Sequence, residues 1–188
     1  MNEVFSYIIS DFTRVYGERE SKWLWTILMK VIFSPFSSLS FLFWFRIAQA
    51  NSYLSWFGRK ACRLIGFIKN VDIPTETEIG YGLYLGHFMC IVINPKTKIG
   101  NNCNISQFLN IGSNHDTPAE IGDNVYIGPH VCIVENVKIG NNATIGAGAI
   151  VTHDIPENAT AVGCPALPIN FNSPGRYIRN KYCKTLNK

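Results

Sequence analysis

The sequence has 188 residues, of which 47% are hydrophobic and 16% charged, and its formal net charge is +4. This composition supplies a buried core for one compact unit and excludes global disorder. Basic residues are scattered, which excludes the clustered Lys and Arg of a nucleic-acid-binding face, and we interpret residues 170–188 as a basic C-terminal tail. None of the six cysteines forms a C-x-x-C pair, and no signal peptide is recognisable at the start. These features indicate a cytoplasmic, reduced protein.

Residues 1–70 are rich in Trp, Phe, Leu and Ser and show helix-like apolar spacing, so we expect an α-helical N-terminal segment. Its longest uncharged stretch runs from Val31 to Phe45 and contains Pro35. A spanning helix needs about 20 apolar residues, so this stretch is too short to cross a membrane. Two interpretations stay open: helices that pack on the rest of the protein and on a partner subunit, or peripheral contact of residues 23–57 with the inner face of the membrane.

A different pattern begins at Asp72, where an aliphatic residue recurs every six positions with two interruptions, and glycine often follows it. The thirteen aliphatic positions are Ile73, Ile79, Leu85, Ile91, Ile99, Ile105, Ile111, Ile121, Ile127, Ile133, Ile139, Ile145 and Val151. Neither a helix nor a simple strand repeats every six residues. Six residues fit one side of a triangular coil, so the pattern predicts a parallel β-helix of about four coils over residues 71–169.

The two interruptions predict where loops leave the coils. Two extra residues lie between Ile91 and Ile99, and four lie between Ile111 and Ile121. In this frame one face of the prism stacks residues 73, 91, 111, 133 and 151. Inserted residues in a repeat protein are extruded as loops, which carry function more often than the coil faces do.

All four histidines, His87, His115, His130 and His153, fall in the repeat region. A neutral imidazole is the usual general base near pH 7. His87 stands two places after an inward-pointing leucine and therefore faces outward, while His115 lies in the longer loop. The wide spacing of the histidines argues against a zinc hydratase built on the same solenoid, so we expect no metal.

The segments VDIPTETEIGYGLYLGHFMCIVINPKTKIGNNCNISQFLNIG and IGDNVYIGPHVCIVENVKIGNNATIGAGAIVTHDIPENATAVGCPALPI resemble the serine acetyltransferase-like branch of the left-handed β-helix, hexapeptide-repeat acyltransferases. The lead-in FLFWFRIAQANSYLSWF is similar to capsule and exopolysaccharide O-acetyltransferases of that branch. The resemblance implies a left-handed coil and acetyl transfer from acetyl-CoA to a hydroxyl group. It also implies a homotrimer or a dimer of trimers, with sites between subunits.

By that resemblance His87 is the general base, Asp72 the carboxylate that orients it, and His115 the second histidine. In our coil register Asp72 and His87 are too far apart for direct contact, so their pairing rests on the resemblance together with an irregular entry to the first coil. The same resemblance places acetyl-CoA along the outside of the coils; the expected contacts are Gly112, Pro129, Ala147 and Gly163.

The chain departs from serine acetyltransferases in three places. Gly86 stands where they carry an aspartate before the base, the loop over 112–120 is shorter, and its usual arginine is missing. The aspartate holds the amino group of serine and the arginine its carboxylate. We therefore expect a hydroxyl of a sugar or polysaccharide precursor as acceptor. Serine O-acetylation and a non-catalytic structural β-helix remain the alternatives.

Overall fold

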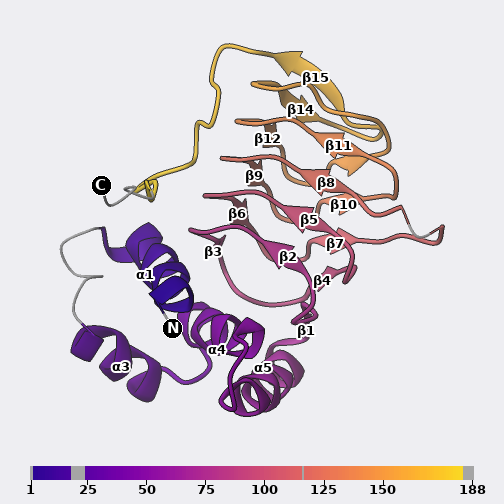
Figure 1. Cartoon of the computed structure of the whole chain (residues 1–188). Helices are drawn as coiled ribbons and strands as arrows, with labels where there is room; N and C mark the ends of the chain where they lie inside the picture. The colour runs from indigo at the N-terminus through magenta and orange to yellow at the C-terminus, as the bar shows by residue number, and fades with distance from the viewer. Residues whose placement is uncertain (1, 18–23, 116, 184–188) are drawn as a thin grey trace.

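A computed structural model describes residues 2–17, 24–115 and 117–183. The helices of the described residues gather at one end of a stack of triangular coils, and β15 lies at the other end (Figure 1). The helices are α1 (Asn2–Tyr16), α3 (Leu24–Phe33), α4 (Ser38–Gln49) and α5 (Ser55–Lys69).

Local sequence accounts for where the helices begin and end. Pro35 lies between α3 and α4 and cannot continue a helix, because its nitrogen carries no hydrogen to donate. The Ser37 hydroxyl then caps α4 by accepting from the Ser40 amide at 3.2 Å. Helix α5 ends at Asn70, whose left-handed backbone (φ 53°) lets its amide donate to the Gly66 carbonyl. No single helix among the described residues meets the length and hydropathy of a membrane span, although the bent pair Trp25–Phe33 and Ser38–Gln49 does so together.

In the described part of the chain, fifteen short strands follow the helices and form three sheets, one on each side of the prism. Their bounds are β1 (Val71–Asp72), β2 (Glu78–Ile79), β3 (Tyr84–Leu85), β4 (Ile91–Ile93), β5 (Lys98–Ile99), β6 (Asn104–Ile105), β7 (Asn110–Ile111), β8 (Glu120–Ile121), β9 (Tyr126–Ile127), β10 (Cys132–Ile133), β11 (Lys138–Ile139), β12 (Thr144–Ile145), β13 (Ile150–Val151), β14 (Thr160–Val162) and β15 (Leu167–Asn170). The sheet orders are β1-β4-β7-β10-β13, β2-β5-β8-β11 and β3-β6-β9-β12-β14-β15. All pairs are parallel except β14 with β15. The six-residue period has the physical origin we predicted, since each repeat supplies one side of a coil.

One part of the predicted register is wrong. Ile93, and not Ile91, pairs with Ile111. Eight residues therefore separate Leu85 from Ile93, and the regular six separate Ile93 from Ile99. The two extra residues lie before β4, in the corner that contains His87, rather than in the following turn.

Small polar side chains stack from coil to coil at another corner of the prism. Asn124, Asn142 and Asn158 all adopt left-handed backbone, which asparagine tolerates. The side-chain amide of Asn124 donates to the side-chain oxygen of Asn142, and that of Asn142 donates to the side-chain oxygen of Asn158, each at 3.1 Å. These repeated bonds satisfy the turn residues of successive coils and keep the stack in register.

A buried ion pair joins the helices to the first coil. Arg46 of α4 donates to both oxygens of Asp11 of α1, at 2.8 and 3.2 Å, and both side chains are 1% exposed. The same guanidinium donates to the carbonyls of Ile79 and Gly80, and Asp11 accepts from the Leu83 amide at 2.8 Å. The helices are therefore held rigidly against the coil that precedes His87.

The chain after β15 returns along the outside of the prism toward α1 (Figure 1). Asn104 donates to the Tyr177 carbonyl at 3.0 Å, and Asn102 exchanges hydrogen bonds with the Tyr182 backbone. Arg14 of α1 donates to the Arg179 carbonyl at 2.9 Å. The described part of the tail is thus packed on the corner that carries the asparagine stack.

Candidate active site

His87 lies on the corner that the two-residue insertion enlarges. Two residues there, His87 (φ 47°) and Cys90 (φ 50°), have left-handed backbone, whereas the corners above have one each. Phe88 between them is buried, and its ring lies 5.0 Å from that of Phe41 in α4. Buried Phe88 anchors the insertion to the helices, and the His87 imidazole is exposed.

A pocket of about 490 Å³ opens beside His87, within the size range of ligand sites. It lies between the coil corner and helices α1, α3 and α4. Its lining consists of Val15, Tyr16, Lys30, Ser34, Phe36, Ser37, Ser38, Leu39, Lys69, Tyr84, Leu85, His87 and Phe88. Among these described residues hydroxyl and lysine side chains supply the polar atoms beside His87, and no carboxylate does.

Asp72 does not share this pocket. It lines a second one, also of about 490 Å³, together with Arg59 and Arg63 of α5. Asp72 lies in β1 and pairs in register with Val92 of β4 on the first sheet. His87 lies at the corner before β4. Within the described part of one chain, Asp72 and His87 make no hydrogen bond or ion pair with each other. The expected pairing of base and carboxylate therefore stays a prediction.

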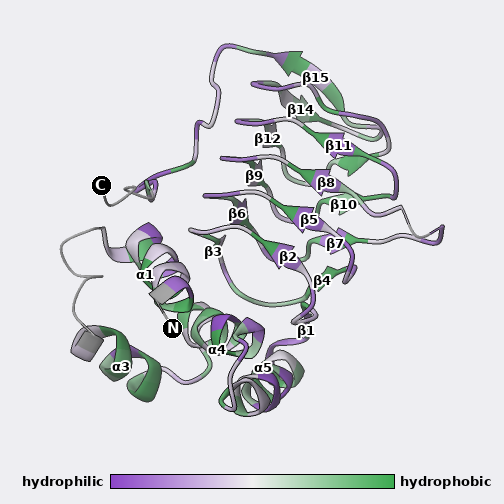
Figure 2. Ribbon diagram, in the orientation of Figure 1, coloured by the Kyte–Doolittle hydropathy of each residue, from purple (hydrophilic) through white to green (hydrophobic). Residues whose placement is uncertain are grey.

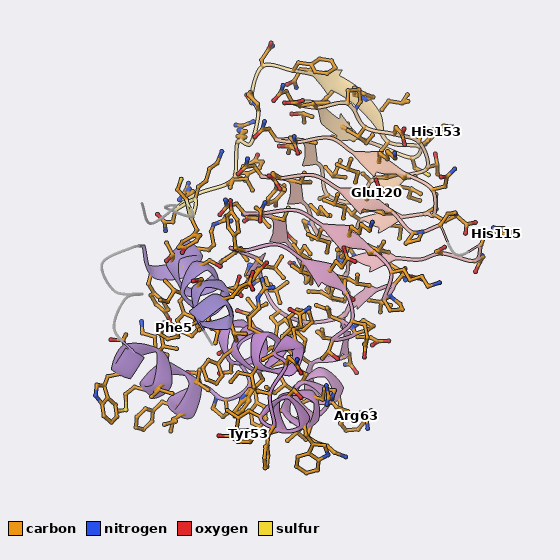
Figure 3. The ribbon with its side chains drawn as sticks, viewed as in Figure 1. Phe5, Tyr53, Arg63, His115, Glu120 and His153 are labelled. Carbon is orange, nitrogen blue, oxygen red and sulfur yellow. The ribbon has the colours of Figure 1, made fainter. Side chains whose placement is uncertain are left out.

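His115 lies in the loop that follows β7 and points away from the coils (Figure 3). Its Nδ1 is 2.7 Å from Oε1 of Glu135, and its backbone amide donates to Oε2 at 2.7 Å. The Asn114 amide donates to the same oxygen at 2.6 Å. An ionised carboxylate only accepts, so Nδ1 is the donor in this contact with Glu135. Sequence reasoning missed Glu135, which orients this histidine.

His87 and His115 stand at opposite ends of the same face of the prism. The strands of the first sheet start at the His87 corner and finish at the 112–120 loop, because all of them run parallel. One chain therefore does not bring the two histidines to one substrate. A neighbouring subunit is needed if both act together.

We expect Glu135→Ala to release the 112–120 loop. The His115 side chain, followed by its backbone amide, lowers the pKa of Glu135 from 4.5 to about 2. Because the folded pKa is depressed, the anchor contributes fully above about pH 4.5 and is lost as the pH falls toward 2. Hydrogen exchange at the Asn114 and His115 amides near neutral pH should accelerate by about tenfold or more in the variant.

Glu120→Ala is the matched control for the loop, since Glu120 makes only an exposed contact of 3.8 Å with Lys138. It should leave those amides protected. Equal exchange rates in wild type and Glu135→Ala would show that the carboxylate does not hold the loop.

Three of the four expected cofactor contacts share the His87 corner. The Gly148 amide donates to the Pro129 carbonyl, and the Ile150 amide to the Gly163 carbonyl, each at 2.9 Å. Pro129, Ala147 and Gly163 therefore follow one another up successive coils. In the coils below, the His130 amide donates to Gln107 and the Phe108 amide to Met89. These residues therefore form a column along the corner, and the column extends down to Met89, two residues after His87.

Gly112 is placed differently from the other expected cofactor contacts. It follows β7 at the loop end of the first sheet, where its amide donates to the Ile133 carbonyl at 3.1 Å. The described part of the basic tail, which ends at Cys183, lies along the asparagine corner rather than beside Pro129 and Ala147. A cofactor on the His87 corner would meet neither of them within one chain.

The remaining histidines have local partners. The His130 ring stacks on Phe108 with centroids 4.4 Å apart, and His153 Nδ1 lies 2.8 Å from the Thr152 hydroxyl. Among the described residues no group of three His, Cys, Asp or Glu side chains is placed to hold a metal ion.

Comparison with known proteins places the chain in a family. A profile described as bacterial transferase hexapeptide (six repeats) matches residues 118–153. Serine acetyltransferase of Bacillus licheniformis is 29% identical over 150 residues, which cover 77% of this chain and 68% of that protein. Serine acetyltransferase of Staphylococcus aureus is 32% identical over 111 residues, which cover 57% of this chain and 52% of the relative.

The solved structure of Neisseria gonorrhoeae serine acetyltransferase in complex with serine matches with a TM-score of 0.68 and 31% identity, over 89% of this chain and 70% of that one. The chain spans about half the length of the staphylococcal relatives. The predicted fold, a left-handed parallel β-helix of about four coils with N-terminal helices, is confirmed. The chain belongs to the left-handed β-helix, hexapeptide-repeat acyltransferases, in their serine acetyltransferase-like branch.

Proposed function

We propose that the protein transfers an acetyl group from acetyl-CoA to a hydroxyl group, with His87 as the general base. One observation carries this proposal. The exposed imidazole of His87 lies on the same corner of the prism as Pro129, Ala147 and Gly163. These three residues lie in successive coils above it. An elongated thioester lying along these coils would present its reacting carbonyl beside His87.

The chemistry is a direct transfer. His87 accepts the proton of the acceptor hydroxyl while that oxygen attacks the thioester carbonyl. A backbone amide at the coil corner would stabilise the negative oxygen of the tetrahedral intermediate. The carbon–sulfur bond then breaks, coenzyme A leaves as its thiolate, and the imidazolium returns the proton to it. Every atom is accounted for without a covalent enzyme intermediate.

A homotrimer or a dimer of trimers completes the site in this proposal. Asp72 and His115 lie away from His87 within one chain, so a neighbouring subunit would supply one or both. Asp72 would orient the imidazole and stabilise its charged form. His115, already fixed by Glu135, offers a second proton acceptor. The site would then act in the cytoplasm, where acetyl-CoA is available.

L-Serine is the acceptor that the relatives favour. Serine acetyltransferases of Bacillus, Staphylococcus and Neisseria all match this chain, and the Neisseria structure holds serine. This comparison supports the serine alternative better than the sugar acceptor that the sequence led us to expect.

A sugar hydroxyl is the second candidate, because the pocket beside His87 does not suit an ammonium group. Lys30 and Lys69 line it, Gly86 precedes the base, and none of its described lining residues is a carboxylate. A neutral or anionic acceptor, such as a polysaccharide precursor, would avoid repulsion by the two lysines.

Thiol release from acetyl-CoA tests both acceptors in one assay. The purified protein is given L-serine, a set of sugars and sugar nucleotides, or no acceptor, and free coenzyme A is measured with a thiol reagent. Release with serine alone supports the first candidate, and release with a sugar alone supports the second. No release above the acceptor-free rate with any of them would support the structural alternative and reject acyl transfer.

A further inference from the structure

Helix α3 and the turn after it leave one apolar side uncovered. Trp25, Met29, Ile32, Phe33 and Phe36 are spaced by one, three or four residues, which brings them to the same side of the segment. Trp25 is 76% exposed and Phe33 is 73% exposed. The opposite side is covered, since Ile27 is fully buried against α1 and α4. Figure 2 shows α3 coloured largely as hydrophobic.

Helix α5 repeats this arrangement. Its glycines and Ile65 face the core, while Phe57, Lys60, Leu64 and Phe67 recur at three and four residues on the outer side. Phe67 is 83% exposed, and Tyr53 in the preceding turn is 84% exposed. Tyr53 points away from the coils at the helical end of the molecule (Figure 3). We call these outer sides of α3 and α5 the aromatic face.

The charged residues of the segment that contains α3, α4 and α5 are all basic. Between Glu20 and Asp72 the sequence contains seven Lys and Arg residues and no Asp or Glu. Arg46 is buried, but Arg59, Lys60 and Arg63 of α5 are exposed beside the aromatic side chains. The Lys60 ammonium lies 5.5 Å from the centre of the Trp56 ring. Exposed aromatic residues with lysine and arginine among them are typical of segments that lie in the headgroup region of a bilayer.

A second copy of the chain related by a two-fold axis is a poor partner for this face. In a two-fold interface a surface meets itself, so Arg59, Lys60 and Arg63 would face the same cations with no carboxylate of residues 21–71 between them. Like charges placed together in an interface are strongly unfavourable. An anionic surface of lipid phosphates complements the same face in both charge and hydrophobicity.

We propose that the aromatic face docks the protein on an anionic phospholipid membrane as a peripheral protein. The aromatic and aliphatic side chains enter the boundary between headgroups and acyl chains, and the cations of α5 contact lipid phosphates. The helical end then meets the membrane and the coils extend away from it (Figure 1). This docking is independent of the acyl transfer proposed above.

Co-sedimentation of the full chain with vesicles tests the proposal. The vesicles are phosphatidylcholine alone or phosphatidylcholine mixed with phosphatidylglycerol. We expect binding to the anionic vesicles, weaker binding to the neutral ones, and a decrease with added salt because salt screens the α5 cations. Failure of the wild-type chain to bind anionic vesicles overturns the proposal.

Two variants separate the apolar and the charged contributions. Ile32→Ser/Phe33→Ser/Phe67→Ser should lower vesicle binding at least about tenfold, because these side chains supply much of the exposed apolar surface. Arg59→Glu/Arg63→Glu should abolish the preference for phosphatidylglycerol. All five side chains are exposed, so circular dichroism and thermal unfolding should stay as in wild type.

The control changes an equally exposed apolar group at the other end of the molecule. Leu167, Ile169 and Phe171 are 59%, 59% and 54% exposed near β15. Their triple serine variant should bind vesicles like wild type, and an equal loss there would overturn the proposal. Sedimentation velocity without lipid gives a second check. If the substitutions on the aromatic face dissociate an oligomer, the face is a protein–protein interface and the proposal is wrong.

Discussion

Replacing His87 with alanine is expected to lower kcat for acetyl transfer by about 10²–10⁴-fold, the usual contribution of a general base. The exposed ring lines the pocket between the coil corner and the helices, and Phe88 holds its backbone against α4. Removing the imidazole leaves this pocket and the column of expected cofactor contacts in place. KM for acetyl-CoA should therefore change little while kcat falls.

His153→Ala is the matched control, since it removes an exposed histidine of a later coil whose Nδ1 lies 2.8 Å from the Thr152 hydroxyl. Its kcat should remain within about twofold of wild type. If His87→Ala keeps kcat within tenfold of wild type, His87 is not the base. His115, with its Glu135 partner, would then be the histidine to test next.

The fold could be predicted because its signal is carried by every coil. An inward aliphatic residue at each sixth position leaves few ways to bury the chain, and the structure follows that period from Val71 onward. The position of the first insertion could not be predicted in the same way. Ile91 and Ile93 are both aliphatic and both buried, so either of them could begin the next repeat. The pairing of Ile93 with Ile111 decides between them.

The candidate site likewise contains one residue that the local sequence identifies and others whose contacts only the fold reveals. His87 is exposed as predicted, and the reason is that it lies in the corner after β3, where its left-handed backbone (φ 47°) turns the chain, rather than on a strand. Glu135 could not be found, since its role depends on a loop from the coil below bending back to it across twenty residues of sequence. The spacing of Asp72 and His87 in the sequence likewise does not show that the two line different pockets of one chain.

The attachment of the helices to the coils was also beyond the sequence pattern. Hydrophobic spacing identifies helices but does not show which charged residue is buried, and Arg46 and Asp11 lie 35 positions apart. Their contact becomes visible only once α1, α4 and the first coil are assembled. Because this ion pair joins α1 and α4 to the corner between β2 and β3, its loss should lower the stability of the whole molecule.

Arg46→Leu is expected to destabilise the protein by about 3–5 kcal/mol, the usual cost of removing one member of a buried ion pair. Burial raises the pKa of the Asp11 carboxyl, and the charge and hydrogen bonds of Arg46 oppose that rise. Without Arg46 the carboxyl is left buried without its partner, and the carbonyls of Ile79 and Gly80 lose a donor. At about 2–4 °C per kcal/mol for a chain of this size, Tm should fall by roughly 6–20 °C.

A double variant separates the cost of leaving the Asp11 charge unpaired from the cost of losing the Arg46 side chain. Asp11→Asn/Arg46→Leu removes both charges, so it should be more stable than Arg46→Leu alone although the carbonyls of Ile79 and Gly80 still lack their donor. Lys138→Ala, which breaks an exposed pair of 3.8 Å, should change the free energy of unfolding by less than about 1 kcal/mol. Urea unfolding of the four proteins measures these differences. If Arg46→Leu unfolds within 1 kcal/mol of wild type, or the double variant is no more stable than the single one, the buried charge is not what holds the helices to the coils.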